Sequence, residues 1–424
     1  MSKPETVICH IDVNSAFLSW TAVYRTQVLG EELDLRSVPS AVCGDIEARH
    51  GVILAKSGSA KRFGVKTGES LFQARQKCPQ LLVVPPDYAL YAAASRKFIA
   101  LLREMAPVVE QYSIDEAWAD ISGTEGLYGP PLLAAARIKD RIRDELGFTV
   151  NIGVSSNKLL AKMAGEFEKP DKVHTLFPWE LEKKLWPLPV RELFMVGAAS
   201  EKKLHSMGIT TIGQLAQADP ARLKARLHKH GLLIWNFANG RCEDEVSDAL
   251  ALNKGYGNSV TTPRDVTTSA LAHKILLSLS ETVGMRMRKD RQAGLTVSVS
   301  IRSADFENRM HQRQLPQPSD STAEIYAAAR RIFDEMWDGT PLRQLGVYVS
   351  RVGRNMGRQI SLFDGDGYEK QAETDRVIDS IRERFGEQAI MRATFLQPGV
   401  EPMSGGLSKE RRSGVTKPLG EEDS

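Results

Sequence analysis

The sequence lacks any long apolar run, and this lack argues against an integral membrane protein with helical spans. No stretch approaches the roughly 18 apolar residues that a bilayer-spanning helix needs. The first residues, MSKPETVICHID, also lack the basic-then-apolar order of a secretion signal. We therefore expect a cytoplasmic protein with no membrane partner.

Cysteine is scarce, with 4 residues in a chain of 424, and no CxxC pair is present. Cys9, Cys43, Cys78 and Cys242 are scattered, and no histidine stands at the spacing of a zinc site. This spacing argues against a zinc-binding domain and predicts four reduced thiols.

Net charge is also small, at +3, but the charge is unevenly distributed. Residues 256–358 carry 15 Lys and Arg against 10 Asp and Glu, whereas residues 364–424 carry 9 against 13. A basic globular segment followed by an acidic extension is typical of a nucleic-acid surface with a solvated tail. On charge alone, an ordinary solvated surface fits equally well.

The length of the chain predicts two to four domains, because 424 residues exceed one typical core. In the first half, apolar runs and helical spacing predict alternating strands and helices. We expect strands at 6–11, in two halves of 108–121 and at 149–154, and helices at 15–29, 88–105, 130–146 and 158–166. This order predicts a ferredoxin-like α+β sheet with an insertion after the first strand.

The second half predicts a helical region, a linker and another mixed domain. Residues 178–240 read as short helices, and the turns at Gly197 and Gly208 indicate either a helix-hairpin-helix or a plain helical hairpin. After a polar linker, residues 256–353 follow the order strand, helix, strand, strand, helix, strand. We expect one amphipathic helix at 374–386 and disorder over 405–424.

Three acidic residues are candidates for a metal site. Asp12 closes an apolar strand, and Asp115 and Glu116 interrupt the later strand pair. Buried carboxylates need a cation, and Mg²⁺ binds through carboxylate and phosphate oxygens. Adjacent strand residues point to opposite faces, so Asp115 and Glu116 reach one site only if the chain turns between them. Taken alone, these acids are better explained as surface turn residues.

Four motifs in order outweigh that explanation: HIDVNSAF at 10–17, AKRFGVKTG at 60–68, YSIDEA at 112–117 and NIGVSSNKLLAKMA at 151–164. Together they resemble the motifs of the Y-family DNA polymerases, the DinB/UmuC-type lesion-bypass enzymes. The resemblance covers about residues 6–360 and implies an α+β multidomain right-hand polymerase. The implied domains are a ferredoxin-like palm (1–20 and 76–168), small fingers (21–75), a helical thumb (169–240), a linker (241–255), an α+β little finger (256–358) and a largely flexible tail (359–424).

The resemblance implies a catalytic site with two Mg²⁺ ions. Asp12, Asp115 and Glu116 are the implied catalytic metal ligands, joined by the backbone carbonyl of Val13. Phe17 falls where the family places an aromatic ring under the incoming sugar. This ring is the implied steric gate that selects dNTPs over rNTPs.

The resemblance also implies contacts with the triphosphate. Lys158 falls at the position of the family's lysine that contacts the triphosphate. Gly58 and Lys61 stand where many members carry a Tyr and an Arg. We expect Lys56, Ser57 or Lys61 to take over that contact, and the sequence does not choose among them.

Two further segments predict partners. Basic residues on the predicted strands of 256–358 and their flanks are expected to neutralise DNA phosphates without reading bases. They are Arg286, Arg288, Lys289, Arg291, Arg302, Arg309, Arg313 and Arg351. Beyond them, Gln359, Ile360, Ser361, Leu362 and Phe363 resemble the peptide that binds the bacterial β sliding clamp. The expected partners are primer–template DNA, dNTPs and this clamp, bound by a monomer.

The sequence therefore predicts an enzyme that copies damaged DNA templates. One alternative is an inactive relative that serves as a clamp-bound adaptor, and the intact acids argue against it. A second alternative is a nucleotidyl cyclase, because a ferredoxin-like sheet with metal-binding acids also suits cyclisation. A cyclase needs neither a thumb, nor a basic extra domain, nor a clamp-like peptide.

Overall fold

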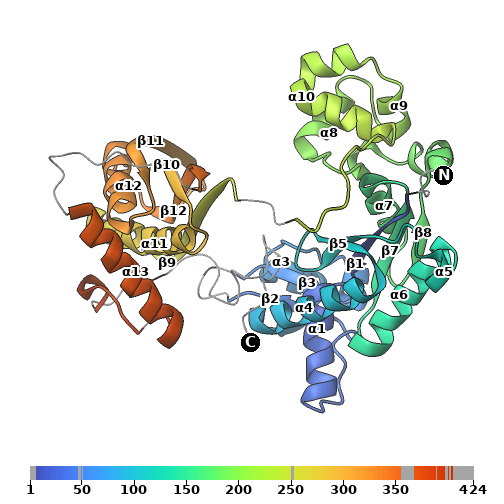
Figure 1. Cartoon of the computed structure of the whole chain (residues 1–424), viewed down its shortest axis with the longest axis horizontal. Helices are drawn as coiled ribbons and strands as arrows, with labels where there is room; N and C mark the ends of the chain where they lie inside the picture. The colour runs from blue at the N-terminus through green and yellow to red at the C-terminus, as the bar shows by residue number, and fades with distance from the viewer. Residues whose placement is uncertain are drawn as a thin grey trace. The chain divides into compact units, whose positions relative to one another are not determined.

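The structure is a computed structural model that describes residues 6–45, 49, 51–249, 253–354, 367–387, 389–396, 400 and 403. The chain divides into two compact units (Figure 1). The first unit is built mainly from residues 1–43 and 52–250, and the second mainly from residues 251–408. None of the described helices is long and apolar enough to cross a membrane.

A five-stranded sheet in the order β5-β6-β1-β7-β8 forms the centre of the first unit. Its strands are β1 (Ile8–Val13), β5 (Val108–Gln111), β6 (Glu116–Asp120), β7 (Val150–Ser155) and β8 (Val173–Thr175). The first four pair antiparallel, and β8 runs parallel to β7. Helices α4 (Tyr88–Met105) and α6 (Pro131–Leu146) supply the core of one face, and the short α5 (Glu125–Tyr128) contacts α6. The predicted ferredoxin-like order is confirmed.

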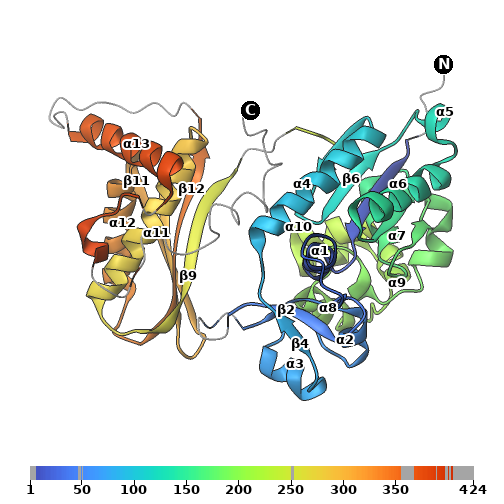
Figure 2. The same cartoon turned by 90° about the horizontal axis from the view of Figure 1, so that it is seen from below.

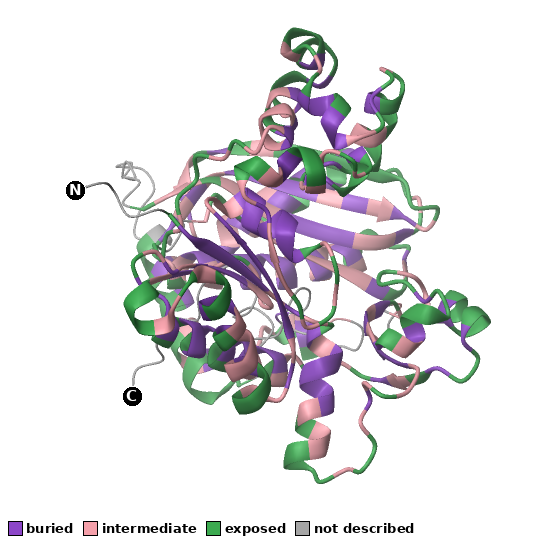
Figure 3. Cartoon of the chain, turned by 90° about the vertical axis from the view of Figure 1, so that its right-hand side faces the viewer, coloured by how far each residue is buried: buried purple, intermediate pink, exposed green. Residues whose placement is uncertain are grey.

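Successive side chains of β1 point to opposite faces of this sheet. The strands of the sheet are largely buried (Figure 3). Cys9, Ile11 and Val13 pack into the core with α4 and α6. The residues between them face α7 (Lys158–Gly165), which covers the other side. This helix lies so close that a Cβ on Gly153 would be 1.9 Å from the Ala161 carbonyl oxygen. Asp12 therefore ends its strand on the face that α7 covers.

The insertion after β1 forms a helix and a small second sheet. Its elements are α1 (Ala16–Val23), the π-helix η1 (Tyr24–Val28), β2 (Ser40–Cys43), β3 (Ile53–Lys56), α2 (Gly58–Arg62), α3 (Leu71–Lys77) and β4 (Leu82–Val84). The strands pair in the order β3-β2-β4. Strand β4 thus belongs to the small sheet, although the sequence predicts that the main sheet's domain resumes at residue 76.

The helical region of the first unit follows β8. It contains the short turns η2 (Pro178–Glu180), η3 (Leu181–Leu185) and η4 (Val190–Glu192), then α8 (Ala198–His205), α9 (Ile212–Ala216) and α10 (Pro220–Ala238). The prediction of short helices also fits α10, because non-helical backbone at His228, where φ is 57°, divides it into two shorter helical stretches. The predicted boundary at 169 differs, because β8 still pairs with the main sheet.

The second unit has the predicted order of elements. They are β9 (Gly255–Val266), α11 (Ser269–Lys289), β10 (Ala293–Ser303), β11 (Asn308–Ser319), α12 (Thr322–Met336) and β12 (Leu342–Gly353). The strands form an antiparallel sheet in the order β11-β10-β12-β9. Both helices lie on one face of it (Figure 2), so the opposite face carries no helix of this unit among the described residues.

A further helix, α13 (Gly367–Phe385), packs on α11 and is followed by the short turn η5 (Ala393–Leu396). Ion pairs hold α13 in place: Arg288 contacts Asp379 at 2.6 Å and Asp375 at 3.3 Å, and Glu281 contacts Arg382 at 3.3 Å. The helix expected at 374–386 is thus present and begins earlier, at Gly367, so this part of the tail is structured and not flexible. The peptide Gln359–Phe363 and residues 405–424 lie outside the described residues.

Candidate active site

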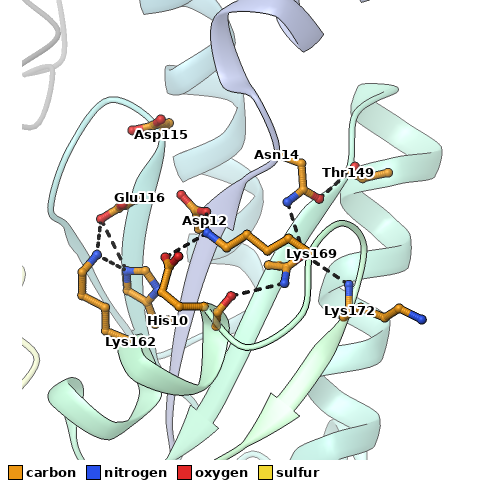
Figure 4. Close-up of polar contacts among 12 residues, drawn as sticks. His10, Asp12, Asn14, Asp115, Glu116, Thr149, Lys162, Lys169 and Lys172 are labelled. Atoms are coloured by element: carbon orange, nitrogen blue, oxygen red, sulfur yellow. Dashed lines mark hydrogen bonds and ion pairs between the residues drawn. The ribbon is translucent and has the colours of Figure 1, made fainter. Parts of the chain in front are cut away.

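The three predicted carboxylates gather where β1 ends and β6 begins (Figure 4). Asp12 lies opposite Glu116 in the antiparallel pairing of these strands. Before Glu116 the chain turns tightly, because the amides of Tyr112 and Ser113 both donate to the Glu116 carbonyl, at 3.0 and 3.2 Å. The required turn is therefore present, but of these two adjacent acids only Asp115 lines the pocket beside the site.

A pocket of about 250 Å³ opens beside two of these acids. It is lined by Asp12, Val13, Ser15, Ala16, Phe17, Leu54, Ala55, Lys56, Thr67 and Asp115. The structure thus brings together Asp12, Asp115, Phe17 and Lys56, which the sequence predicts as site residues. Glu116 does not line the pocket, and its carboxylate contacts His10 and the α7 residue Lys162 instead.

Phe17 is held rigidly at the pocket by other aromatic rings. Its ring stacks on Tyr91 with a centroid distance of 4.5 Å and an interplanar angle of 6°. The rings of Trp20 and Tyr88 each lie 6.1 Å from it. Tyr91 is in turn fixed by a 3.0 Å hydrogen bond between its hydroxyl and that of Thr21. The position of the Phe17 ring is therefore set by a buried cluster and not by the pocket itself.

Burial shapes the charge of the acids. It raises the pKa of Asp12 to about 6, although Lys169 opposes that shift, and it also raises the pKa of Asp115. Burial alone would raise the pKa of Glu116 as well, but His10 and Lys162 outweigh it and lower the pKa to about 2. The Lys162 ammonium donates to Glu116 at 2.7 Å. Glu116 is thus ionised, whereas burial makes the charged forms of Asp12 and Asp115 unfavourable.

This donor set fits divalent magnesium. A bound cation would remove the cost that burial imposes on the charged forms of Asp12 and Asp115. Mg²⁺ prefers one or two carboxylates, with water and substrate phosphates completing its shell. Within the described ranges, no three acidic, His or Cys side chains are grouped as a complete metal cage.

Lys169 lies at the site, and the sequence analysis missed it. Its ammonium donates to Asp12 at 2.5 Å and to Glu166 at 2.8 Å (Figure 4). Burial would lower the pKa of Lys169, but these two carboxylates raise it. The segment Lys169-Pro170-Asp171 reads in the sequence only as a break between elements. Lys169 stands 157 positions from Asp12, so no local sequence signal could have identified it.

Two amides orient the loop that carries Lys169. The Asn151 side chain donates to the Glu168 carbonyl at 2.6 Å and to the Gly165 carbonyl at 3.2 Å. Asn14 donates to Asn151 at 3.2 Å and accepts from the Asp171 amide at 3.0 Å. Since Asn14 follows Asp12 by two residues, the same stretch of chain supplies the acid and holds its partner loop.

Lys158 does not line the pocket, although the resemblance implies a triphosphate contact for it. Its ammonium donates to both carboxylate oxygens of Glu110, at 2.7 and 2.8 Å, and lies 4.5 Å from the ring centroid of Trp118. The resemblance aligned the lysine by motif, but Glu110 on the neighbouring strand determines where the side chain points. Lys158 is thus engaged away from the pocket.

The three candidates for a triphosphate contact in the insertion, Lys56, Ser57 and Lys61, differ in their surroundings. Lys56 lines the pocket, donates to Thr67 at 3.0 Å, and has its pKa lowered by burial and by the nearby charge of Lys61. Lys61 is exposed on α2. Ser57 is buried and caps α2 by accepting from the Ala60 amide at 3.1 Å, so its hydroxyl is used by the fold. Lys56 is the candidate best placed to meet a ligand in the pocket.

The open face of the second unit's sheet is polar and nearly uncharged. On β10, Val297, Val299 and Ile301 pack towards α11 and α12, so the alternating residues face the other way. These are Thr296, Ser298, Ser300 and Arg302. Ser298 pairs with Gln312 on one side and Tyr348 on the other. Arg302 is thus a predicted basic residue that the structure puts on this face.

Several of the other predicted basic residues are engaged within the unit. Arg288 is 9% exposed and paired with α13, so its assignment to DNA is corrected. Arg309 and Arg313 point to the helical side and pair with Asp338 at 2.6 Å and Glu335 at 2.8 Å. Arg286 donates to the Gly257 carbonyl at 3.0 Å. Lys289, Arg291 and Arg351 are exposed.

Comparison with protein families gives two matches to this chain. The sequence profile of the impB/mucB/samB family matches residues 11–166, and that of the C-terminal domain of the same family matches residues 253–362. The two matches cover more than half of the chain. They include the three carboxylates, Phe17 and the second unit's sheet, but not α13.

Similar proteins cover almost the whole chain. DNA polymerase IV of Clostridium acetobutylicum is 46% identical over 398 residues, which are 94% of this chain and 99% of that protein. DNA polymerase IV of Acetivibrio thermocellus is 38% identical over 396 residues, 92% of this chain and 98% of that protein. Among solved structures, a Y-family DNA polymerase chimera, Dbh-Dpo4(243-245)-Dbh, matches with a TM-score of 0.69 at 21% identity, covering 82% of this chain and 100% of that one.

Proposed function

Because this chain belongs to the impB/mucB/samB family of Y-family polymerases and is a DNA-directed DNA polymerase of the translesion type, we propose that Asp12, Asp115 and Glu116 hold its two Mg²⁺ ions. Primer–template DNA and dNTPs are its substrates. The observation that supports the metal assignment is the gathering of three carboxylates beside a pocket, two of them with pKa values raised by burial. When bound, such ions polarise the attacking primer hydroxyl and stabilise the leaving pyrophosphate.

The protein's own groups have distinct tasks in this proposal. Glu116 stays ionised because His10 and Lys162 hold it, so it presents charge without competing for protons. The Val13 carbonyl, beside Asp12 at the pocket, is a further oxygen ligand in the proposal. Phe17 forms a rigid wall where a sugar would lie, and it excludes a ribose 2′-hydroxyl by contact. These roles need the pocket to hold one nucleotide in a fixed orientation.

Lys169 is the proposed triphosphate contact, in place of Lys158. It is a flexible point charge beside Asp12, and phosphate oxygens entering there would lie within its reach. Lys56, which lines the pocket, is the second proposed contact, with exposed Lys61 nearby. Ser57 is not proposed, because its hydroxyl caps α2.

The domain names follow as proposals from the family. The palm is the five-stranded sheet with its helices, and the fingers are the small sheet of β2, β3 and β4 with α2 and α3. The thumb is the helical region from η2 to α10, and the little finger is the second unit's sheet with α11 and α12. DNA is proposed to meet the little finger on its open face, near Arg302, with exposed Lys289, Arg291 and Arg351 as further phosphate contacts.

We also retain the proposal that Gln359–Phe363 binds a bacterial β sliding clamp. The support is the peptide itself, a Gln followed by an aliphatic, a polar, a Leu and a Phe residue, which suits an apolar pocket with a hydrogen-bonding rim. Such a tether raises the local concentration at the primer end. We propose a monomer that works in the cytoplasm, with the clamp as its partner on DNA.

Primer extension by the purified chain tests the proposed function. With Mg²⁺ and dNTPs, we expect template-directed incorporation on undamaged and damaged templates, and we expect EDTA to stop it. Loading a bacterial clamp on the template should lengthen the products. Absence of incorporation on every template would contradict the assignment and favour a non-catalytic adaptor.

Lys169→Ala should raise the KM for dNTP by about ten- to a hundredfold, the range expected when a charge-assisted hydrogen bond is lost. Lys172→Ala is the matched control, because Lys172 lies in the same loop and is 51% exposed. Steady-state incorporation with varied dNTP measures both. A KM within twofold of the unsubstituted enzyme would remove Lys169 from the triphosphate site.

A further inference from the structure

The segment after α10, residues 241–249, has no helix or strand of its own, yet it is held along the palm. It leads from the thumb towards the little finger. Three hydrogen bonds hold this segment and Gly240 before it. Asn157 donates to the Gly240 carbonyl at 3.0 Å, Lys158 donates to the Glu245 carbonyl at 3.5 Å, and the Ser247 amide donates to Glu110 at 2.9 Å. In addition, Val246 packs on Ile8, Trp118 and Ala161. The segment is therefore a pinned stretch of chain.

Glu110 and Lys158 are the centre of these contacts. The Lys158 ammonium contacts both carboxylate oxygens of Glu110, and the side chains of Glu110 and Lys158 are only 24% and 12% exposed. The Lys158 ammonium also lies over the Trp118 ring, whose indole nitrogen donates to the Lys158 carbonyl at 3.0 Å. A shielded pair of this geometry is stronger than an ordinary surface ion pair. It presents one carboxylate oxygen to an amide of the segment and an ammonium to a carbonyl.

The same elements carry the proposed catalytic acids. Lys158 begins α7 one turn before Lys162, which holds Glu116. Trp118 follows Glu116 by two residues on β6, so both face α7. Neither Glu110, Lys158 nor Trp118 is among the described residues that line the nucleotide pocket. The group is thus rigidly connected to the active site without pointing into it.

We propose that Glu110, Lys158 and Trp118 form a clasp that fixes the linker residues Glu245–Ser247 on the palm. In this role they are positioning residues, since they determine where the tether of the little finger leaves the palm. The inference rests on the proposed function, because it assigns the tether a task in gripping DNA. It also accounts for the position of Lys158, which the triphosphate role does not.

The size of the effect follows from tether length. Ser247 and Asn253 are 6 positions apart in the sequence, and Gly240 and Asn253 are 13 apart. Opening the clasp would therefore about double the length of chain between the last held residue and Asn253. The effective concentration of a tethered module falls roughly as the −3/2 power of tether length, so doubling it costs about threefold. We therefore expect loss of the clasp to weaken binding of primer–template DNA by about threefold.

Glu110→Ala in the full chain is the principal test, and it has two readouts. Hydrogen exchange of peptides within 243–249 should rise about tenfold, because the Ser247 amide loses its charged acceptor. The dissociation constant for primer–template DNA should rise about threefold, while kcat at saturating DNA and the KM for dNTP stay unchanged. Glu110→Gln keeps an acceptor for Ser247 and should restore most of the protection. Glu145→Ala, which removes an exposed ion pair on α6, should change neither readout.

Two results would overturn the clasp. One is unchanged exchange in Glu110→Ala, which would mean that Glu110 does not hold the segment. The other is a raised KM for dNTP with unchanged DNA affinity, which would return Glu110 and Lys158 to the nucleotide site. The exchange measurement needs no catalysis, so it reports on the clasp even if the enzyme incorporates no nucleotide. If Glu110→Ala fails to fold, exchange in Glu110→Gln compared with Lys158→Ala decides the same question.

Discussion

Asp115→Ala is expected to abolish nucleotide incorporation, lowering kcat by on the order of 10³-fold or more, the effect of losing several kcal/mol of metal-dependent charge stabilisation. Asp115 lines the pocket, and burial raises the pKa of its carboxyl, so its charge is costly unless a cation shares it. Alanine removes both an oxygen ligand and a negative charge. Single-turnover incorporation at saturating dNTP and DNA measures the loss.

The control for this prediction is Asp144→Ala. Asp144 is a carboxylate of the same unit, 65% exposed on α6 and far along the chain from the pocket residues. It should leave kcat unchanged. DNA affinity of Asp115→Ala should also remain within a few-fold, because the carboxylate does not grip the duplex in this proposal. Residual incorporation at more than a tenth of the normal rate would contradict the assignment of Asp115 as a metal ligand.

Phe17→Ala is expected to relax sugar selection, raising the use of rNTPs relative to dNTPs by about ten- to a hundredfold. The estimate corresponds to relieving about 1–3 kcal/mol of steric overlap. The ring cannot move aside to admit a 2′-hydroxyl, because it is stacked on buried Tyr91. The ratio of kcat/KM for a matched rNTP and dNTP measures the change.

Phe72→Ala is the matched aromatic control, since Phe72 is 72% exposed on α3 and does not line the pocket. It should leave the sugar ratio unaltered. The dNTP kcat/KM of Phe17→Ala should fall only modestly, because the lost ring touches no reacting atom in the proposal. An unchanged rNTP ratio would move the gate to another wall of the pocket.

Local sequence signals were sufficient for much of the palm. Helix α4 was predicted with the bounds that it has, because Ala-rich spacing marks its length and Asp87 caps its start by accepting from the Leu90 amide. Strands β1 and β6, which carry Asp12 and Glu116, overlap the segments that were predicted as strands. Their pairing brings the acids together, which the order of elements alone implies for this fold.

The misses have a common physical cause, which is that a charged side chain's direction depends on tertiary partners. Lys169 reaches Asp12 only because Asn14 and Asn151 hold its loop, and no local pattern announces those amides. Lys158 turns to Glu110, a residue 48 positions away in the sequence. Arg288 was assigned to DNA as one of the basic residues on the predicted strands of 256–358 and their flanks, but its side chain turns to Asp375 and Asp379.

Helix α13 buries charged side chains instead of apolar ones. Asp375 and Arg382 lie on its inner side, whereas Val377 on its outer side is 54% exposed. Its partners on α11, Glu281 and Arg288, are 3% and 9% exposed. Removing one side of such a buried pair typically costs about 3–5 kcal/mol, because the other charge is left without compensation. The little finger therefore contains two buried charges, on Glu281 and Arg288, whose partners come after residue 366 in the sequence. A chain that ended at the clamp-like peptide would lose those partners. Its little finger would be less stable to unfolding, besides being separated from the clamp.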